Sequence, residues 1–191
     1  MSVIRRIADY SQTSSEVAGV PKPEVGLETF RAKLRDVILG AEMRVAIYGT
    51  GGAGGYFGAQ LARSGEDVTF VARGQHLNAI EEHGLRLETP TGEIVIQPAK
   101  VTDDLAQIGP VDVILLGVKA WQVDEAARKI EPMVGPETFV VPLQNGVEAP
   151  SQLVALLGAE RVLGGLCGTF SWVVAPGRIR TLGAHTARPG S

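Results

Sequence analysis

Residues 44–55 read Arg-Val-Ala-Ile-Tyr-Gly-Thr-Gly-Gly-Ala-Gly-Gly and place a glycine-rich turn directly after a short apolar segment. The apolar part, 44–48, predicts a buried β-strand, and residues 56–64 have the spacing of a helix that stops at Gly65. Within the turn, residues 49–54 match the pattern G-x-G-x-x-G. That pattern indicates dinucleotide binding where it joins a strand to a helix, which is its position here.

The same alternation of strand and helix continues along the chain. Apolar segments of strand length are separated by amphipathic segments of helix length. We expect strands at 67–72, 111–118 and 138–143 and helices at 75–82, 123–131 and 149–157. Regular alternation is typical of parallel strands joined by right-handed helical crossovers. The predicted fold class is therefore α/β, a doubly wound Rossmann-type parallel sheet.

The predicted sheet occupies only part of the chain. Residues 1–42 are expected to form a loose N-terminal extension with one short helix at 27–39, where apolar residues recur at helical spacing. Residues 43–183 form the predicted nucleotide-binding domain, and residues 184–191 form a tail.

Two further segments alternate like hairpins rather than like strand–helix–strand units. They are 85–101 and 161–182, each with a proline–glycine turn. We expect Cys167 to lie in a strand of the second hairpin. Trp121 and Trp172 are expected to be packing residues rather than platforms for stacking.

Composition argues against several classes of protein. Of the 191 residues, 45% are hydrophobic, which is enough for a core, and no apolar stretch approaches the roughly 20 residues of a membrane helix. Residues 43–150 carry fourteen acidic and eight basic side chains, a poor surface for nucleic acid. The lone Cys167 cannot form an internal disulfide, which favours the cytoplasm. The three histidines share no ligand-like spacing, so no metal site is expected.

Each glycine of the pattern has a predicted part in binding a dinucleotide. Gly49 allows the tight turn, Gly51 lets the backbone approach a pyrophosphate, and Gly54 lets helix and strand pack closely. The start of the helix adds free N–H groups and the positive end of the helix dipole. The alternative is a glycine loop that only permits close packing.

The residue after the second strand indicates which nucleotide is bound. An NAD site commonly has an acidic residue there, about 20 residues beyond the glycines, for the ribose 2′-hydroxyl. Here the strand runs into Arg73, Asp67 stands at its opposite end, and the next carboxylate is Glu81. A guanidinium suits a 2′-phosphate, so NADP(H) is favoured over NAD(H). The alternative is that Arg73 is a solvated surface residue.

Two polar residues follow later strands at the same predicted edge of the sheet. Lys119 comes directly after 111–118, and Asn145 comes soon after 138–143. Ligands of doubly wound sheets bind at this edge, where a lysine can hold a phosphate or carboxylate and an amide offers both donor and acceptor. The alternative is a solvated Lys119 and an Asn145-Gly146 turn.

Three motifs of the chain resemble those of the ketopantoate reductase family, over about residues 43–183. The first is the turn Gly49–Gly55 followed by Tyr56-Phe57-Gly58, with the strand Val68–Arg73. The second and third are Val118-Lys119-Ala120-Trp121-Gln122-Val123 and Gln144-Asn145-Gly146-Val147-Glu148. The resemblance implies NADPH-dependent reduction of 2-dehydropantoate, a small 2-oxo acid, to pantoate in pantothenate and coenzyme A biosynthesis.

The resemblance also assigns residues to the site. It implies that Gly49, Thr50, Gly51, Gly52, Ala53 and Gly54 hold the pyrophosphate and that Arg73 holds the 2′-phosphate. It implies that Lys119 lies by cofactor and substrate and that Asn145 contacts both.

A departure from the family's pattern sets a second expectation. The family continues into a helical C-terminal domain that carries the catalytic lysine, and nothing after Leu182 resembles its start. We therefore expect residues 1–191 alone to have no reductase activity or a very weak one. We also expect the surface left exposed to associate with a second copy of the chain or with the missing domain. Two alternatives stay open, namely an NADP-binding module without its own activity and a reductase of another 2-oxo acid.

Overall fold

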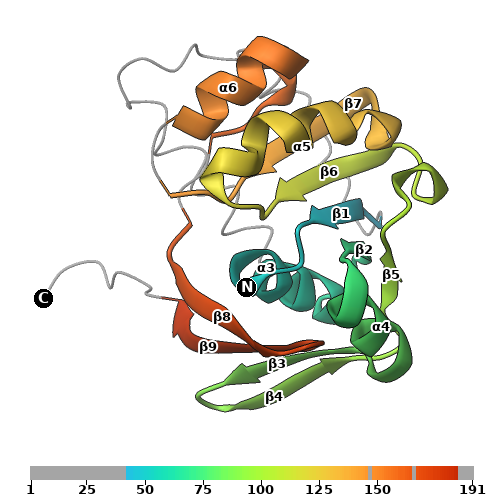
Figure 1. Ribbon diagram of the computed structural model, residues 1–191, viewed down its shortest axis with the longest axis vertical. Coiled ribbons are helices and arrows are strands. Elements are labelled where there is room, and N and C mark those ends of the chain that lie inside the picture. The colour runs from blue at the N-terminus through green and yellow to red at the C-terminus, as the bar shows by residue number, and fades with distance from the viewer. Residues whose placement is uncertain (1–41, 146–147, 165–166, 185–191) are drawn as a thin grey trace, which may run out of the picture.

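The computed structural model of the protein describes residues 42–145, 148–164 and 167–184 (Figure 1). The helix expected at 27–39, with nearly all of the expected extension and tail, lies outside these residues. Within the described part, no helix has both the length and the apolar character needed to cross a membrane.

A five-stranded parallel sheet forms the centre of the molecule. Its strands in spatial order are β5 (Lys100–Thr102), β2 (Asp67–Val71), β1 (Arg44–Tyr48), β6 (Val111–Leu116) and β7 (Val134–Pro142). Every neighbouring pair is parallel. Because β1 lies in the middle, the chain winds outward first in one direction and then in the other, which confirms the doubly wound fold.

Helices cover both faces of this sheet (Figure 1). The helices are α3 (Gly52–Arg63) and α4 (Gly74–His83) on one face and α5 (Val123–Lys129) and α6 (Glu148–Leu157) on the other. Alternate residues of β1 serve the two cores: Val45 and Ile47 pack on the α3 side, and Ala46 and Tyr48 pack on the α5 side. Burial on both faces explains why the strand is apolar after its first residue, the exposed Arg44.

Short 3-10 turns connect several of these elements. They are η2 (Leu105–Gln107), η3 (Ala120–Gln122), η4 (Glu131–Met133) and η5 (Ala159–Arg161).

A second, four-stranded sheet lies against α3, on the side away from the first sheet (Figure 1). Its strands in spatial order are β4 (Gly92–Ile96), β3 (Leu85–Thr89), β9 (Arg178–Ala184) and β8 (Thr169–Ala175). The two expected hairpins are present over shorter ranges, because residues 100–101 belong to β5 of the first sheet and residues 161–164 precede β8. They are joined by a parallel pairing of β3 with β9 that local pattern does not reveal. Leu85, Leu87 and Ile179 are fully buried within the α3 core.

Three local expectations are wrong. Cys167 precedes β8 and lies in no strand. Trp121 is 81% exposed, because it lies in η3, a single turn that follows the loop after β6. Trp172 is 42% exposed and stands beside Arg180 in the β8–β9 ladder rather than in either core.

Candidate functional site

The glycine turn after β1 touches the loop that follows β6. Gly49 has a φ of +98°, a left-handed conformation that favours glycine. A Cβ on Gly49 would also lie 3.0 Å from the backbone of Gly117 and Val118. The Gly117 N–H donates to the carbonyl of Tyr48 over 2.8 Å. These contacts bring the ends of the two central strands together at the carboxyl edge of the sheet.

The next glycines differ in what surrounds them. A Cβ on Gly51 would meet no atom within 4 Å, so its Cα faces open space. A Cβ on Gly54 would lie 2.2 Å from the carbonyl oxygen of Gly49, and one on Gly52 would lie 2.1 Å from that of Ser171 in β8. Gly54 thus permits the close approach of helix and turn, while Gly51 leaves room beside the backbone.

Helix α3 begins at this turn with its first N–H groups free of a side-chain cap. The N-cap residue is Gly51, which has no side chain that could accept from these N–H groups. The first backbone hydrogen bond of the helix is donated by the Gly55 N–H to the Gly51 carbonyl over 2.8 Å. The N–H groups of residues 52–54 precede that bond and therefore have no partner within the helix. Such a helix start is suited to an anion.

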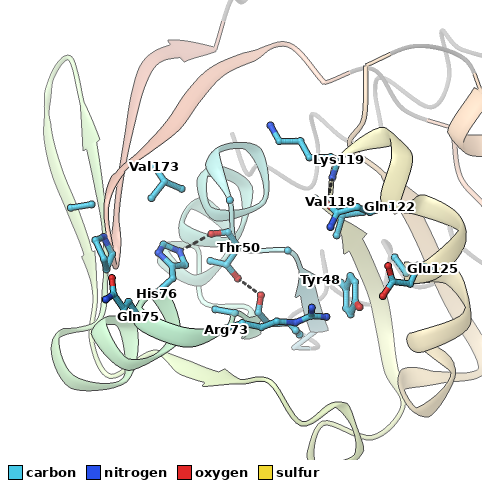
Figure 2. Close-up of a pocket in the computed structure, with 18 of the residues that line it drawn as sticks. Tyr48, Thr50, Arg73, Gln75, His76, Val118, Lys119, Gln122, Glu125 and Val173 are labelled. Atoms are coloured by element: carbon cyan, nitrogen blue, oxygen red, sulfur yellow. Dashed lines mark hydrogen bonds between the residues drawn. The ribbon is translucent and has the colours of Figure 1, made fainter.

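Thr50 fixes the turn to the end of β2. Its hydroxyl donates to the Val71 carbonyl over 2.9 Å, and its N–H donates to the same oxygen over 3.1 Å. The residue is 4% exposed. Its carbonyl oxygen lies 2.7 Å from Nε2 of His76 (Figure 2). Thr50 thus holds together the turn, the end of β2 and the start of α4.

A pocket of about 660 Å³ opens at the carboxyl edge of the sheet. Four segments line it: residues 48–51, 71–76, 117–126 and the end of β8 with its turn, 173–176. Arg73 and Lys119, which follow the ends of β2 and β6, lie on opposite sides of the pocket (Figure 2). The structure therefore brings together the glycine turn, Arg73 and Lys119.

Not every residue predicted for the site lines the pocket. Gly52, Ala53 and Gly54 lie just behind it, in the first turn of α3. Asn145 is exposed, beyond the end of β7. Its neighbour Gln144 donates from Nε2 to the carbonyls of Leu116 and Val118, over 2.8 and 2.9 Å, and so ties the segment before Asn145 to the loop that carries Lys119.

Two ionisable side chains of the pocket have shifted pKa values. Burial lowers the pKa of His76, although its contact with the Thr50 carbonyl acts in the opposite sense. The hydrogen bond and charge of Lys129 lower the pKa of the exposed Glu125 carboxyl, and the charge of Arg73 adds to this effect. Among the described residues, no group of three or more His, Cys, Asp or Glu side chains is placed to hold a metal ion.

Sequence reasoning missed His76 as a part of this pocket. The spacing of the three histidines indicates no metal site and says nothing about a role in this pocket. The position of His76 is the informative feature, because it lies three residues after Arg73 in the first turn of α4, at the ligand-binding edge of the sheet.

The chain is similar to known oxidoreductases over most of its described length. The family model "Ketopantoate reductase PanE/ApbA" matches residues 45–190. The 2-dehydropantoate 2-reductase of Mesorhizobium japonicum is 35% identical over 159 residues, covering 72% of this chain and 48% of that protein. The crystal structure of 2-dehydropantoate 2-reductase from Geobacter metallireducens is 37% identical with a TM-score of 0.71, covering 74% of this chain and 47% of that one.

A solved structure of a different enzyme is also similar. The ternary structure of D-mandelate dehydrogenase with NADH and anilino(oxo)acetate is 26% identical with a TM-score of 0.68, covering 74% of this chain and 46% of that one. By all three comparisons, the chain spans about half the length of the proteins it matches.

Proposed function

The chain belongs to the ketopantoate reductase PanE/ApbA family, and we propose that its pocket binds NADP(H) for the reduction of 2-dehydropantoate to pantoate, in pantothenate and coenzyme A biosynthesis. The observation that carries the proposal is one pocket lined by the glycine turn, by Arg73 and by Lys119. The glycine turn would bind the pyrophosphate and Arg73 the 2′-phosphate, and Lys119 would lie by the nicotinamide and the substrate.

The residues present fit a dinucleotide phosphate. The open space at Gly51 leaves room for a pyrophosphate against the backbone, and the uncapped start of α3 supplies N–H donors beside it. Gly49, Thr50, Gly51, Gly52, Ala53 and Gly54 would together form this cradle. A helix N-terminus and a close backbone approach are the two features that dinucleotide-binding turns share.

The charges at the end of β2 favour NADP(H) over NAD(H). Asp67 stands at the beginning of β2 and is bound to Lys100 over 2.6 Å, so it does not reach the pocket. Arg73 lies at the other end of the strand and is exposed to the pocket. The carboxylate that lines the pocket, Glu125, is on α5, where Lys129 forms a hydrogen bond with it and the charge of Arg73 also reaches it. A guanidinium at this point can form a bidentate, charged contact with a phosphate.

Lys119 and Asn145 are proposed to handle the substrate. When bound, the nicotinamide would supply the hydride for reduction of the 2-oxo group. Lys119 lines the pocket, and a lysine ammonium can hold a carboxylate or a phosphate. The hydrogen bonds of Gln144 hold the segment just before Asn145 close to the loop that carries Lys119. From this position the side-chain amide of Asn145 can donate a hydrogen bond to one ligand and accept one from the other.

A second candidate is an NADH-dependent enzyme acting on another 2-oxo acid. The similarity to D-mandelate dehydrogenase bound to NADH and an oxo acid favours it. A fold of this kind serves several chemistries, because substrate choice depends on the site rather than on the sheet.

Titration of the purified chain with NADPH and NADH, followed by nicotinamide fluorescence, tests the proposal. Tighter binding of NADPH supports the first candidate, and tighter binding of NADH supports the second. Absence of binding to either dinucleotide contradicts both. A panel of 2-oxo acids, scored by the rate of NADPH oxidation above the buffer rate, then identifies the substrate: the first candidate requires 2-dehydropantoate to give the highest rate.

A further inference from the structure

His76 forms hydrogen bonds to two parts of the chain that lie far apart in sequence. Nε2 lies 2.7 Å from the carbonyl oxygen of Thr50 in the glycine turn. On the other side of the ring, Nδ1 accepts from the N–H of Gly177 over 3.0 Å. Gly177 is in the turn between β8 and β9, so the imidazole connects the two walls of the pocket.

These partners determine the protonation state of the ring. A carbonyl oxygen only accepts and a backbone N–H only donates, so Nε2 must carry the proton and Nδ1 must be bare. The neutral Nε2–H tautomer satisfies both contacts. Protonation of Nδ1 would set two donors against each other and break the bond to Gly177.

Gly177 in turn positions the wall of the pocket formed by the end of β8. Its carbonyl accepts from the N–H of Arg86 at the start of β3 over 2.9 Å, so its N–H and C=O are both held. A Cβ on Gly177 would lie 3.2 Å from Ala79 of α4, which shows how closely the turn packs on that helix. Residues 173–176, just before Gly177, line the pocket.

We infer that His76 is a positioning residue for the cofactor: its neutral ring holds the glycine turn and the β8–β9 turn at the spacing that the dinucleotide needs. This inference rests on the proposed function, because it assigns the pocket to NADP(H). It implies that affinity for the cofactor falls as the solution is acidified through the pKa of the ring.

The surroundings of the ring agree with a neutral state. Burial lowers its pKa, so the folded protein holds the ring neutral at a pH where a free histidine is partly charged. Within the described residues no carboxylate forms an ion pair with it. The charged groups on the elements around it are Arg73 before α4, Glu81, Glu82 and His83 on α4, Arg178 bound to Glu88 beside the turn, and Lys119 and Glu125 across the pocket.

The test compares NADP⁺ affinity of the parent protein, His76→Gln and His83→Gln by calorimetry at about pH 8 and about pH 5.5, on either side of the usual histidine range. Glutamine does not titrate there. His83 is the matched control, because it is exposed in the last turn of the same helix. The 2′-phosphate itself titrates near pH 6, so the ratio of parent to variant affinity is read at each pH rather than the affinity alone.

We expect the parent to bind about 3- to 10-fold more tightly than His76→Gln at the higher pH, the weight of one neutral hydrogen bond. The ratio should fall to near one at the lower pH, and the His83→Gln ratio should be near one at both. The inference is overturned if the ratio of parent to His76→Gln affinity is the same at both pH values, or if it is larger at the lower pH. A larger ratio at the lower pH would mean that the imidazolium contacts a phosphate. No binding of NADP⁺ by the parent at the higher pH would instead overturn the proposed function.

A measurement on the parent protein alone keeps the inference testable if His76→Gln does not fold. Nitrogen NMR of the imidazole should show the Nε2–H tautomer, and the Gly177 amide should be protected from hydrogen exchange at the higher pH. Loss of that protection should coincide with protonation of His76. A ring in the Nδ1–H tautomer, or an unprotected Gly177 amide, overturns the inference.

Discussion

The hydroxyl of Thr50 donates to the backbone carbonyl of Val71 over 2.9 Å, two residues before Arg73. This contact connects the turn proposed for the pyrophosphate with the strand end proposed for the 2′-phosphate. Both subsites therefore belong to one hydrogen-bonded unit, and the distance between them is set by β1 and β2 rather than by a flexible loop.

Replacing Thr50 by valine should loosen that unit without changing its shape. The Val71 carbonyl keeps the Thr50 N–H, so the loss is one neutral hydrogen bond, about 0.5–1.5 kcal/mol of unfolding free energy. Affinity for NADPH should fall more than affinity for NADH, because only NADPH uses both subsites. Urea unfolding and fluorescence titration measure the losses of stability and affinity, and Thr50→Ser, which keeps the hydroxyl, is the control. Equal losses of affinity for the two dinucleotides would contradict this role.

Arg73→Ala should act on cofactor choice alone. A charged hydrogen bond to a 2′-phosphate is worth about 1.5–3 kcal/mol, so NADPH affinity should fall about 10- to 100-fold while NADH affinity barely changes. Arg63→Ala is the matched control, because Arg63 is an exposed arginine at the end of α3 that does not line the pocket. Equal affinities of the parent chain for NADPH and NADH would show that Arg73 is only a surface residue.

Gly51→Ala should weaken cofactor binding with little loss of stability, whereas Gly54→Ala should lower stability. The methyl group of Gly51→Ala meets no protein atom, so the substitution should lower the unfolding free energy by less than about 1 kcal/mol, as is usual for a change at an N-cap. The same methyl group fills the space proposed for the pyrophosphate, so NADPH binding should weaken at least about tenfold, which corresponds to the loss of one hydrogen bond to a charged group.

The Gly54→Ala methyl meets the Gly49 carbonyl at 2.2 Å, an overpacking that typically costs about 1–3 kcal/mol. It should therefore lower the melting temperature clearly. Thermal unfolding and NADPH titration of both variants separate the two effects. A stable Gly54→Ala protein, or a Gly51→Ala protein that binds normally, would contradict the assignment.

The sequence was sufficient for the parallel sheet and its glycine turn because their signals are local. The two central strands are buried on both faces and so are apolar apart from Arg44 in β1 and Asp112 in β6, and the turn stands between a strand and a helix. The second sheet was not predictable in the same way. Leu87 pairs with Ile179 across more than ninety residues, and no local pattern shows which of two hairpins will join in parallel.

The same limit applies to the site. The segments with Arg73 and Lys119 were placed at one edge because parallel strands all end there. The same rule places His76 at this edge, but its two hydrogen bonds could not be predicted, because its partners come from different loops and one of them is 101 residues away. The ligand contacts of Lys119, Asn145 and the glycine turn remain predictions.

Reduction of a ketone needs a proton donor as well as a hydride, because the carbonyl oxygen becomes negative as the hydride arrives. The ionisable side chains lining the described pocket are Tyr48, Arg73, His76, Lys119 and Glu125. Arginine does not give up its proton in proteins, the lowered pKa of Glu125 keeps it ionised, and both ring nitrogens of His76 are engaged. Tyr48 is 4% exposed and packs in the core on the α5 side, and Lys119 is proposed to bind the ligands rather than to give up a proton. No lysine follows Lys129 in the sequence.

We therefore expect the 191-residue chain to bind NADPH but to reduce 2-dehydropantoate at least about 10³-fold more slowly than the 2-dehydropantoate 2-reductases to which it is similar. General acid catalysis typically contributes about 10²–10⁴-fold, and orientation of the substrate contributes more. The measurement is NADPH oxidation at saturating substrate, with Lys119→Met beside the parent chain. If Lys119 supplies the residual proton, the variant should lose that residual rate while keeping its fold by circular dichroism. Turnover by the parent chain within the usual enzymatic range of about 1–10³ per second would contradict the expectation, and it would mean that a donor outside this set of pocket residues serves the reaction.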